Sequence, residues 1–351
     1  MTSAMTLGFW YPIVLTRHLR RGTLTRQHVA GVPIVMGRDR RGAPFAFLDH
    51  CPHRGMPLSF ARFDGGTLEC AYHGWRFDAQ TGTCQAIPSL PSDTTVSISK
   101  ITATRVPAVD RDGHVWVYLA DPLAPGAAPP PPPTLPVFSA RHHLTHLAVD
   151  VGCGFDEAVI SLLDPAHGPF VHRAWWWRKP RMMYDKSKVF EPIPDGFRIP
   201  PHEPSGNSAP YKVLRLYRYP KQTTIEFHLP STRLEVTRCG PYWFSSRTVV
   251  IPIDANRCRL DFCAAWNMFR MVPLVSKVFR LFGGMFLRQD KRSLERLALG
   301  LAHGPSTMLL GDADTPARWY LQLRTAYLNA RRSGEALKHP LEQPTRLRWR
   351  S

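Results

Sequence analysis

Acidic residues are scarce in this chain of 351 residues, which has 27 Asp and Glu against 45 Lys and Arg, a formal net charge of +18. Composition alone is weak evidence for nucleic-acid binding, and the basic residues are scattered, with their densest stretch at 331–351. A positive surface that attracts an acidic redox protein explains the charge equally well, as does a solvated surface without a specific role. We expect no nucleic-acid partner.

Long hydrophobic runs are also lacking. Residues 7–15 are apolar, but no basic segment precedes them and Pro12 interrupts them, so we expect no secretory leader there. The longest later apolar stretch, 266–287, contains Arg270, Lys277 and Arg280 and falls short of the roughly 20 apolar residues that a spanning helix needs. We therefore expect a soluble, cytoplasmic protein without a transmembrane segment, with an amphipathic surface helix at 266–287 as the alternative.

A disulfide framework is absent as well. The seven cysteines are odd in number and show no framework spacing, which favours reduced thiols in a reducing compartment. Two of them belong to the pattern described next. The other five are expected to be small buried hydrophobic residues: Cys84, Cys153, Cys239, Cys258 and Cys263.

Four potential metal ligands dominate the first third of the chain: Cys51, His53, Cys70 and His73, in the order C-P-H, a gap of 16 residues, then C-A-Y-H. Two Cys and two His can hold a structural zinc ion. They can also hold a [2Fe–2S] cluster, with thiolates on one iron and imidazoles on the other. The ligand types alone leave both alternatives open.

The residues around these ligands carry a family resemblance. The segments CPHRG at 51–55 and CAYHGW at 70–75 resemble the two loops of a Rieske domain, and the resemblance extends from Trp10 to Val117. The chain closely resembles the Rieske non-haem iron oxygenases, the α-subunit family of ring-hydroxylating oxygenases, and in particular their single-subunit, homotrimeric members. This resemblance implies a [2Fe–2S] cluster, of the lower-potential oxygenase type because the loops carry no additional cysteine pair.

A second candidate metal site lies further along. His167 and His172, with a carboxylate from elsewhere, suit the facial triad of a non-haem Fe(II) centre. Residues five apart on an ideal helix point about 140° apart, so we expect Gly168-Pro169 to break the helix and let both imidazoles converge. Spacing alone also fits an ordinary pair of histidines. The string D-x-x-H-x₄-H from Asp164 to His172, however, resembles the mononuclear-iron motif of the same family.

Spacing cannot select the third ligand. The segment 289–295 is amphipathic and helical in pattern, and it resembles the family segment that supplies the carboxylate, so we predict Asp290. The alternative for Asp290 is a solvated helix residue paired with Lys291 or Arg292. Asp312 matches a later segment of the family. The other candidate carboxylates are Glu226, Asp254, Asp261 and Asp314.

Asp164 resembles the bridging aspartate of the family. The resemblance implies that it joins His73 of one subunit to His167 of the next, where a carboxylate between two imidazoles orients both. The alternative is a helix-capping aspartate that accepts hydrogen bonds from nearby backbone N–H groups.

The pattern of short strands and helices predicts an α+β protein. We expect an all-β Rieske domain at 8–122, a Pro-rich linker at 123–136, a catalytic domain at 137–330 and a basic tail at 331–351. The run 129–133 is all proline and suits a stiff connector. In the catalytic domain we expect an antiparallel sheet with helices, a helix-grip-like arrangement. The predicted helices are 156–163 and 285–299, and the predicted strands are 211–219, 223–229, 234–237, 248–253 and 258–265.

The resemblance implies an oxidoreductase that uses O₂ and externally supplied electrons to hydroxylate, demethylate, N-oxidise or desaturate an apolar or aromatic small molecule. No Gly-rich dinucleotide fingerprint is present, so a ferredoxin, a flavin-dependent NAD(P)H reductase or both must deliver the electrons. The length and the lack of a C-terminal anchor match the homotrimeric members. The alternatives are the α-subunit of a ring-cis-dihydroxylating dioxygenase, and an electron carrier whose iron site has decayed.

Overall fold

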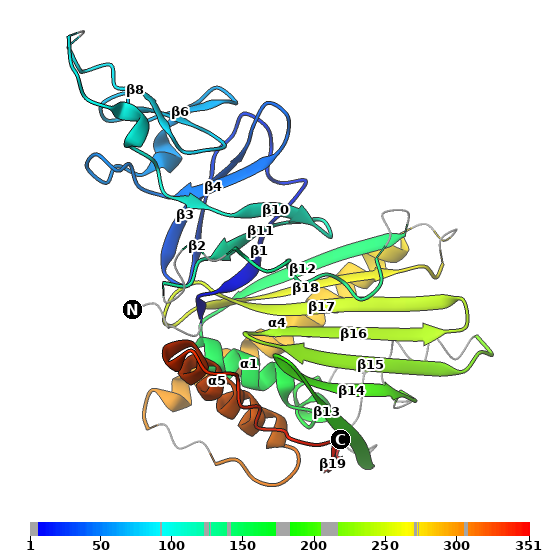
Figure 1. Ribbon diagram of the computed structural model, residues 1–351. Coiled ribbons are helices and arrows are strands. Elements are labelled where there is room, and N and C mark those ends of the chain that lie inside the picture. The colour runs from blue at the N-terminus through cyan, green and yellow to red at the C-terminus, as the bar shows by residue number, and fades with distance from the viewer. Residues whose placement is uncertain are drawn as a thin grey trace. The chain divides into compact units, whose positions relative to one another are not determined.

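The structure is a computed structural model of the chain. It describes residues 6–91, 93–122, 126, 128–138, 142–172, 183–204, 217–269, 272, 274–304 and 308–351. The chain divides into two compact units, Met1–Pro133 and Thr134–Ser351, whose elements are labelled in Figure 1. The division lies inside the stretch predicted as a Pro-rich linker, and residues 128–135 form neither helix nor strand. The runs of proline there explain this, because proline cannot donate a backbone hydrogen bond.

The described part of the first unit is built from short antiparallel strands. Three sheets form, with strand orders β1-β11-β10, β2-β3-β4-β9 and β5-β6-β7-β8. The elements are β1 (Phe9–Leu15), β2 (Thr25–Val29), β3 (Val32–Arg38), β4 (Pro44–Leu48), η2 (Leu58–Phe60), β5 (Arg62–Phe63), β6 (Thr67–Glu69), β7 (Arg76–Asp78), β8 (Cys84–Ala86), η3 (Ile98–Lys100), β9 (Arg105–Val106), β10 (Ala108–Arg111) and β11 (His114–Leu119). The all-β character predicted for this part of the chain is confirmed.

The core of the first unit supports the two loops that begin at Cys51 and Cys70. Phe45 and Phe47 lie two residues apart on β4, so both point to the same side of the strand, and both are buried. They belong to one apolar cluster with Leu68, and the same cluster contains Cys51 and Cys70. Burying each phenylalanine stabilises the fold by about 2 kcal/mol. The core therefore fixes the start of both cysteine loops.

The second unit combines one antiparallel sheet with helices. The eight strands are ordered β12-β18-β17-β16-β15-β14-β13-β19. The elements are β12 (His143–Val151), α1 (Phe155–Leu163), α2 (Gly168–Val171), β13 (Asp185–Ile193), β14 (Gly196–His202), β15 (Lys221–His228), β16 (Thr232–Cys239), β17 (Tyr242–Pro252), β18 (Cys258–Trp266), α4 (Val275–Leu301), α5 (Thr315–Ser333) and β19 (Thr345–Arg350). This confirms the predicted α+β class with an antiparallel sheet. Of the predicted strand 211–219, residues 211–216 lie outside the described part.

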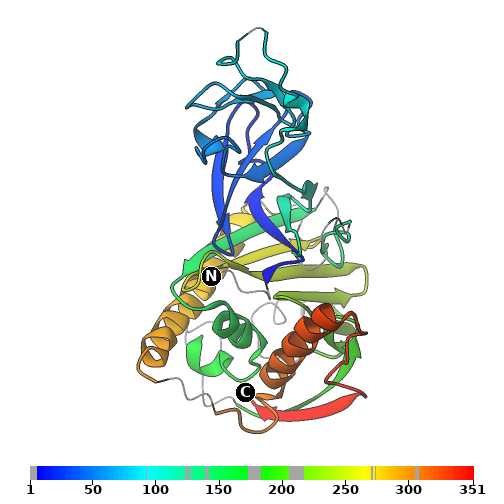
Figure 2. The same cartoon turned by 60° about the vertical axis from the view of Figure 1, so that its left-hand side comes forward.

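The helices pack on one face of the sheet, as Figure 2 shows for α4 in orange, α1 in green and α5 in red-brown. Phe279 of α4 lies 4.8 Å from Trp266 of β18, measured between ring centroids. Trp319 of α5 packs edge-on against Phe190 and Phe197 of neighbouring strands, at 5.6 and 5.7 Å. These aromatic contacts hold α5 and α4 over the sheet, and α4 carries part of the second candidate site.

The C-terminal stretch predicted as a basic tail is partly structured. Helix α5 ends at Ser333, and Gly334 follows with φ of 75°, the left-handed conformation that commonly ends a helix. Residues 345–350 then pair as β19 with β13 in antiparallel register, and Leu347 is buried there. Within the described ranges, no helix has the length and apolarity to cross a bilayer.

Candidate metal centres

Two loops of the first unit share one hydrogen-bond pattern. In each loop the cysteine N–H donates to the carbonyl five residues on, and the cysteine carbonyl accepts from the glycine N–H four residues on. These bonds join Cys51 N to Met56 O (2.7 Å), Gly55 N to Cys51 O (2.9 Å), Cys70 N to Trp75 O (2.8 Å) and Gly74 N to Cys70 O (3.0 Å). Both glycines have positive φ, 75° and 68°, which is why glycine suits these positions. The predicted ligands therefore lie on two equivalent turns.

The four ligands form a buried thiol pair and a more exposed imidazole pair. Cys51 and Cys70 are 1% and 4% exposed, and their thiols are in hydrogen-bond contact, while burial, reinforced by the Cys70 thiol, raises the pKa of Cys51 to about 11. The rings of His53 and His73 lie 4.7 Å apart between centroids. Desolvation and then the nearby His73 lower the pKa of His53.

This arrangement decides between one zinc ion and a two-iron cluster. A single tetrahedral zinc needs all four donor atoms around one point. In the described residues, no three of these four donors lie within 4.8 Å of one another. Two thiols on one side and two imidazoles on the other instead match a Rieske-type [2Fe–2S] cluster. The donor set fits the cluster and not the zinc site.

Aromatic rings surround the imidazole pair, and sequence reasoning gave them no role. The Trp75 ring stacks on the His53 ring with 4.5 Å between centroids and 6° between planes. The Tyr72 ring lies 3.8 Å from that of His73. The signal in the sequence was their place inside the second loop, beside the ligands.

The second centre brings together the predicted His167, His172 and Asp290. Their donor atoms all lie within 4.8 Å of one another. Asp290 Oδ1 is 3.2 Å from His172 Nε2 and 4.0 Å from His167 Nε2. The two rings are 5.4 Å apart between centroids, at 69°. Two imidazoles and one carboxylate around one point suit a non-haem Fe(II) ion with open positions, so the donor set fits iron.

The backbone brings the two histidines together in a different way from the one predicted. Helix α1 ends at Leu163, and the short helix α2 starts at Gly168 with Pro169 in its first turn. His167 and His172 flank that turn at its two ends. The expectation that Gly168-Pro169 breaks a helix is wrong, because proline is favoured in the first turn, where its missing N–H costs nothing. The break instead falls between Leu163 and His167.

Two hydrogen bonds fix which nitrogen each histidine presents to the centre. His172 Nδ1 lies 3.0 Å from Gln289 Oε1, and His167 Nδ1 lies 2.7 Å from the backbone oxygen of Asp164. Both oxygens only accept, so each Nδ1 carries the proton and each Nε2 keeps its lone pair for a metal. Sequence reasoning missed Gln289, and its only signal was its place beside Asp290.

Asp164 contributes to the site mainly through its backbone. Its side-chain Oδ1 accepts a hydrogen bond of 2.7 Å from the Ala166 N–H, and Oδ2 is 3.9 Å from His167 Nδ1. Asp164 is the C-cap residue of α1, and its carboxylate accepts from a nearby backbone N–H in the turn between the helices, as the capping alternative predicted, although it does not cap the start of α2. The side chain is 34% exposed. The predicted link to His73 involves another subunit and stays a prediction.

The other candidate carboxylates have different partners within the second unit. Glu226 meets His228, Asp254 meets Arg257, Asp261 meets His146, Asp312 accepts from the Arg348 N–H, and Asp314 accepts from the Leu310 N–H. The alternative of Asp290 as a solvated residue paired with a neighbouring cation is also wrong: its side chain is 16% exposed and faces the histidines.

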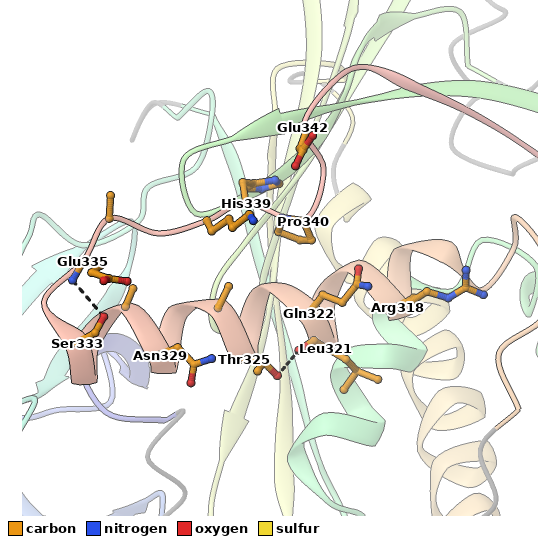
Figure 3. Close-up of a pocket in the computed structure, with 14 residues that line it drawn as sticks. Arg318, Leu321, Gln322, Thr325, Asn329, Ser333, Glu335, His339, Pro340 and Glu342 are labelled. Carbon is orange, nitrogen blue, oxygen red and sulfur yellow. Dashed lines mark hydrogen bonds between the residues drawn. The ribbon is translucent and has the colours of Figure 1, made fainter.

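A separate groove of about 620 Å³ runs along α5, between that helix and the segment that follows it (Figure 3). Gln322, Thr325 and Asn329 line the helix side, and His339 lies on the other. His339 Nε2 is held by the carbonyl of Gly196 at 2.7 Å. None of the predicted site residues lines this groove.

Comparison with known proteins supports the first centre. The sequence profile of the Rieske [2Fe-2S] domain matches residues 9–105. Chlorophyllide a oxygenase of Chlamydomonas reinhardtii is 32% identical over 296 residues, which cover 81% of this chain and 42% of the relative. The 4beta-methylsterol monooxygenase of Methylococcus capsulatus is 32% identical over 175 residues, covering 49% of this chain and 46% of the relative. The chain thus spans about half the length of these relatives.

Solved structures show the same fold over nearly the whole chain. Dicamba monooxygenase bound to dicamba matches with a TM-score of 0.70 at 22% identity, covering 94% of this chain and all of the other. The NdmA QL mutant of Pseudomonas putida CBB5 with theobromine matches with a TM-score of 0.72 at 18% identity and 96% coverage of each chain. One further structure of dicamba monooxygenase, at a TM-score of 0.70, is described as containing non-heme iron.

Proposed function

Because the chain belongs to the Rieske non-haem iron oxygenases, we propose that it is an enzyme that uses O₂ and electrons from another protein to oxidise an apolar or aromatic small molecule. The observation that carries this proposal is the meeting of His167, His172 and Asp290 within 4.8 Å, in a chain that also has a Rieske domain. An electron carrier would need the cluster alone. An intact second donor set supports catalysis.

The protein contributes the positions of its ligands and the surroundings of each centre. Cys51, Cys70, His53 and His73 would hold the cluster, and His167, His172 and Asp290 would hold the iron. When bound, the cluster supplies single electrons and the iron supplies the chemistry of O₂ activation. Gln289 and the Asp164 carbonyl keep both iron-binding imidazoles in the tautomer that offers Nε2. His172 is 1% exposed and stacks on Phe286 at 3.5 Å, which limits water at this side of the iron site.

Electrons must come from a partner, since the sequence has no dinucleotide fingerprint. A ferredoxin, a flavin-dependent NAD(P)H reductase or both would supply them. The net charge of +18 supports attraction of an acidic partner. Such attraction weakens as salt shortens the screening length, from about 10 Å at 0.1 M. A rate of electron delivery that is independent of salt would remove this part of the proposal.

The substrate class follows from the relatives. Those matched are named for chlorophyllide a and a methylsterol, and the solved structures of the same fold hold dicamba or theobromine. A ring system is common to all four names. Hydroxylation or demethylation of a ring compound is therefore the reaction we propose.

We also propose a homotrimer in a reducing compartment such as the cytosol. A trimer would let Asp164 of one subunit meet His73 of the next, and the exposure of the Asp164 side chain is compatible with that role. All seven cysteines are free thiols in the structure, which suits a reducing compartment.

The test is the content of iron and acid-labile sulfide per chain after anaerobic purification, with EPR of the reduced protein. About three irons and two sulfides with a Rieske-type signal are expected. Two irons would mean a cluster without a catalytic centre and would favour an electron carrier. Zinc without sulfide would overturn the assignment of the first centre.

A further inference from the structure

We propose that the outward face of α4 docks this protein on the surface of an anionic lipid bilayer. The outward face is defined here by two groups of residues. Its apolar half consists of Leu274, Val278, Leu281 and Phe282, and its cationic half consists of Arg288, Arg292 and Arg296.

The two faces of α4 are sharply different. The inward face packs on the sheet or lines the iron site through Phe279, Gly283, Phe286 and Asp290. These residues recur at intervals of four, three and four, the spacing of one side of an α-helix. A Cβ at Gly283 would come within 2.5 Å of Leu147 Cδ1, so the helix lies close against β12 there. On the other side of α4, Leu274, Val278 and Leu281 are each more than half exposed.

The apolar half of the outward face is exposed to an unusual degree. Leu274 is 60% exposed, Val278 52%, Leu281 60% and Phe282 39%. Val278 and Leu281 lie three residues apart on one side of the helix, and Leu274 is the N-cap residue directly before it, so all three lie near the start of α4. Val272, just before the helix, is 47% exposed as well. Single exposed apolar residues are normal, but a contiguous apolar patch indicates an interaction surface.

The cationic half continues the same side of the helix. Arg288 follows Leu281 by seven residues, which is close to two helical turns, and Arg292 and Arg296 follow at intervals of four. All three arginines are exposed. Helix α4 contains six Lys and Arg but only two acidic residues, Asp290 and Glu295.

Neither acidic residue neutralises the outward face. Asp290 points inward to the histidines. Glu295 pairs with Lys291 Nζ at 3.2 Å and accepts from the Gly152 N–H at 3.4 Å. The first 15 residues of the helix, 275–289, contain no carboxylate at all. The outward face therefore combines apolar side chains with uncompensated positive charge.

This combination identifies the occupant as a bilayer with anionic headgroups. Interfacial helices bury an apolar face at the boundary of the acyl chains and bind acidic lipids through Lys and Arg. A second copy bound through a two-fold contact on the same face would bring the two rows of arginines together, and like charges repel. A contact of this face with a different face of another copy, as in the proposed trimer, is tested below by the sedimentation mass of L281E. Helix α4 has no stretch that is apolar enough to span a bilayer. It would therefore lie on the surface of the bilayer.

Docking would place the candidate iron centre near the bilayer. Asp290 lies on the side of α4 opposite the outward face, about one helix diameter, 10–12 Å, away. An apolar substrate dissolved in the bilayer would then enter the site from close by. This consequence rests on the proposed function, whereas the docking itself does not.

Flotation of the full-length protein with vesicles tests the proposal. The vesicles are phosphatidylcholine alone, or phosphatidylcholine mixed with phosphatidylglycerol. We expect the protein to float with the mixed vesicles and not with the neutral ones. The triple variant R288Q/R292Q/R296Q should bind the mixed vesicles about a hundredfold more weakly, since each cation near such a surface contributes about 1 kcal/mol. L281E should abolish flotation by placing a charge in the apolar half.

Matched controls separate this face from general charge and general hydrophobicity. R41Q/R111Q/R238Q removes three exposed arginines elsewhere, and V96E places a charge at a residue of the first unit that is 56% exposed. Both controls should bind like the wild type, because neither touches the outward face. EPR of the reduced cluster verifies that the first unit of each variant is folded, and far-UV circular dichroism verifies that the second unit, which carries α4, is folded as well.

Three results would overturn the proposal. The first is a wild-type protein that does not float with mixed vesicles. The second is equal loss of binding in R41Q/R111Q/R238Q and R288Q/R292Q/R296Q, which would mean that only net charge matters. The third is a fall in the sedimentation mass of L281E without vesicles, which would show that this face binds a second copy of the chain. Failure of the proposed function would show instead as missing iron, with flotation unaffected.

Discussion

Gln289 Oε1 lies 3.0 Å from His172 Nδ1, and the next residue of the same helix, Asp290, meets the other nitrogen of that ring at 3.2 Å. Two consecutive residues of α4 thus hold one imidazole from both sides. One residue sets the tautomer and the other completes the donor set. The iron site therefore depends on the rotation of α4 about its axis as much as on the identity of its ligands.

Replacing Gln289 should weaken iron binding without touching the cluster. Q289L removes the acceptor that Gln289 offers to the buried His172 Nδ1–H, so we expect a loss of about 10- to 100-fold in iron affinity. Q289E keeps an acceptor at the same place and should retain iron. Iron titration of chelated protein measures the affinity, while the EPR signal of the cluster serves as the internal control. Equal iron binding by Q289L and wild type would contradict the role of this residue.

Removing the carboxylate of Asp290 should empty the second site alone. With D290A, two imidazoles remain, and we expect iron to fall from about three to about two per chain with sulfide unchanged at about two. The matched control is D312A, which removes the main competing candidate, a carboxylate that accepts from the Arg348 N–H instead. If D312A lost iron and D290A retained it, the ligand assignment would be wrong.

The side chain of Asp164 should matter for electron transfer and not for metal content. Its backbone carbonyl, which orients His167, survives in D164N, so both metal sites should stay occupied. If the carboxylate joins His73 of a neighbouring subunit, turnover should fall by about 10- to 100-fold, as for other residues that support metal ligands. Rapid mixing of the reduced protein with O₂ and substrate follows oxidation of the cluster. A wild-type rate in D164N would remove the bridge.

The ligands could be predicted from sequence because each belongs to a motif, whereas their supporting residues do not. Asp290 was identified through its segment, but Gln289 is indistinguishable in sequence from a surface glutamine. Its contact to His172 arises only when α4 packs beside α2. The contact of the Trp75 ring could not be predicted for the same reason, because its stacking on His53 depends on the fold of the second cluster loop.

The boundaries of α4 show where local patterns mislead. The predicted helix started at 285, directly after Gly283-Gly284, and glycine costs a helix about 1 kcal/mol per residue. The observed helix starts at Val275 and runs through both glycines. Close packing on Leu147 requires glycine at 283, so a tertiary contact outweighs the propensity.

Strand β19 was overlooked for a different reason. Its sequence alternates Arg346, Arg348 and Arg350 with Leu347 and Trp349, which is the period of a strand. The high charge made this segment read as a solvated tail. Pairing with β13 buries Leu347 and leaves Arg346 and Arg348 exposed.

His228 should make the stability of the second unit depend on pH. Its Nδ1 lies 2.9 Å from Asp195 Oδ1, its Nε2 lies 3.2 Å from Glu226 Oε2, and its side chain is 25% exposed. Burial alone would lower the pKa of His228, but the hydrogen bonds and charges of Asp195 and Glu226 outweigh it and raise the pKa above the ordinary value. The protonated form is therefore favoured in the folded state.

The sign of the effect follows from linkage. A raised folded pKa contributes stability that is fully present below the unfolded pKa of about 6.5 and is lost as pH rises through the folded pKa. H228Q should therefore lower the free energy of unfolding most in acid, by about 1.5–3 kcal/mol, the range for hydrogen bonds to charged groups. The difference from wild type should shrink in alkali. Urea unfolding at about pH 5.5 and about pH 9 measures it.

The matched control for this experiment is His28, which is exposed and has no carboxylate partner among the ion pairs of the described residues. H28Q should leave the free energy of unfolding unchanged at both pH values, since an exposed imidazole without a charged partner gains nothing on folding. A deficit of H228Q that is constant with pH would mean that the imidazole acts by packing alone. A deficit that grows in alkali would reverse the sign and show that the neutral ring is the form the fold prefers.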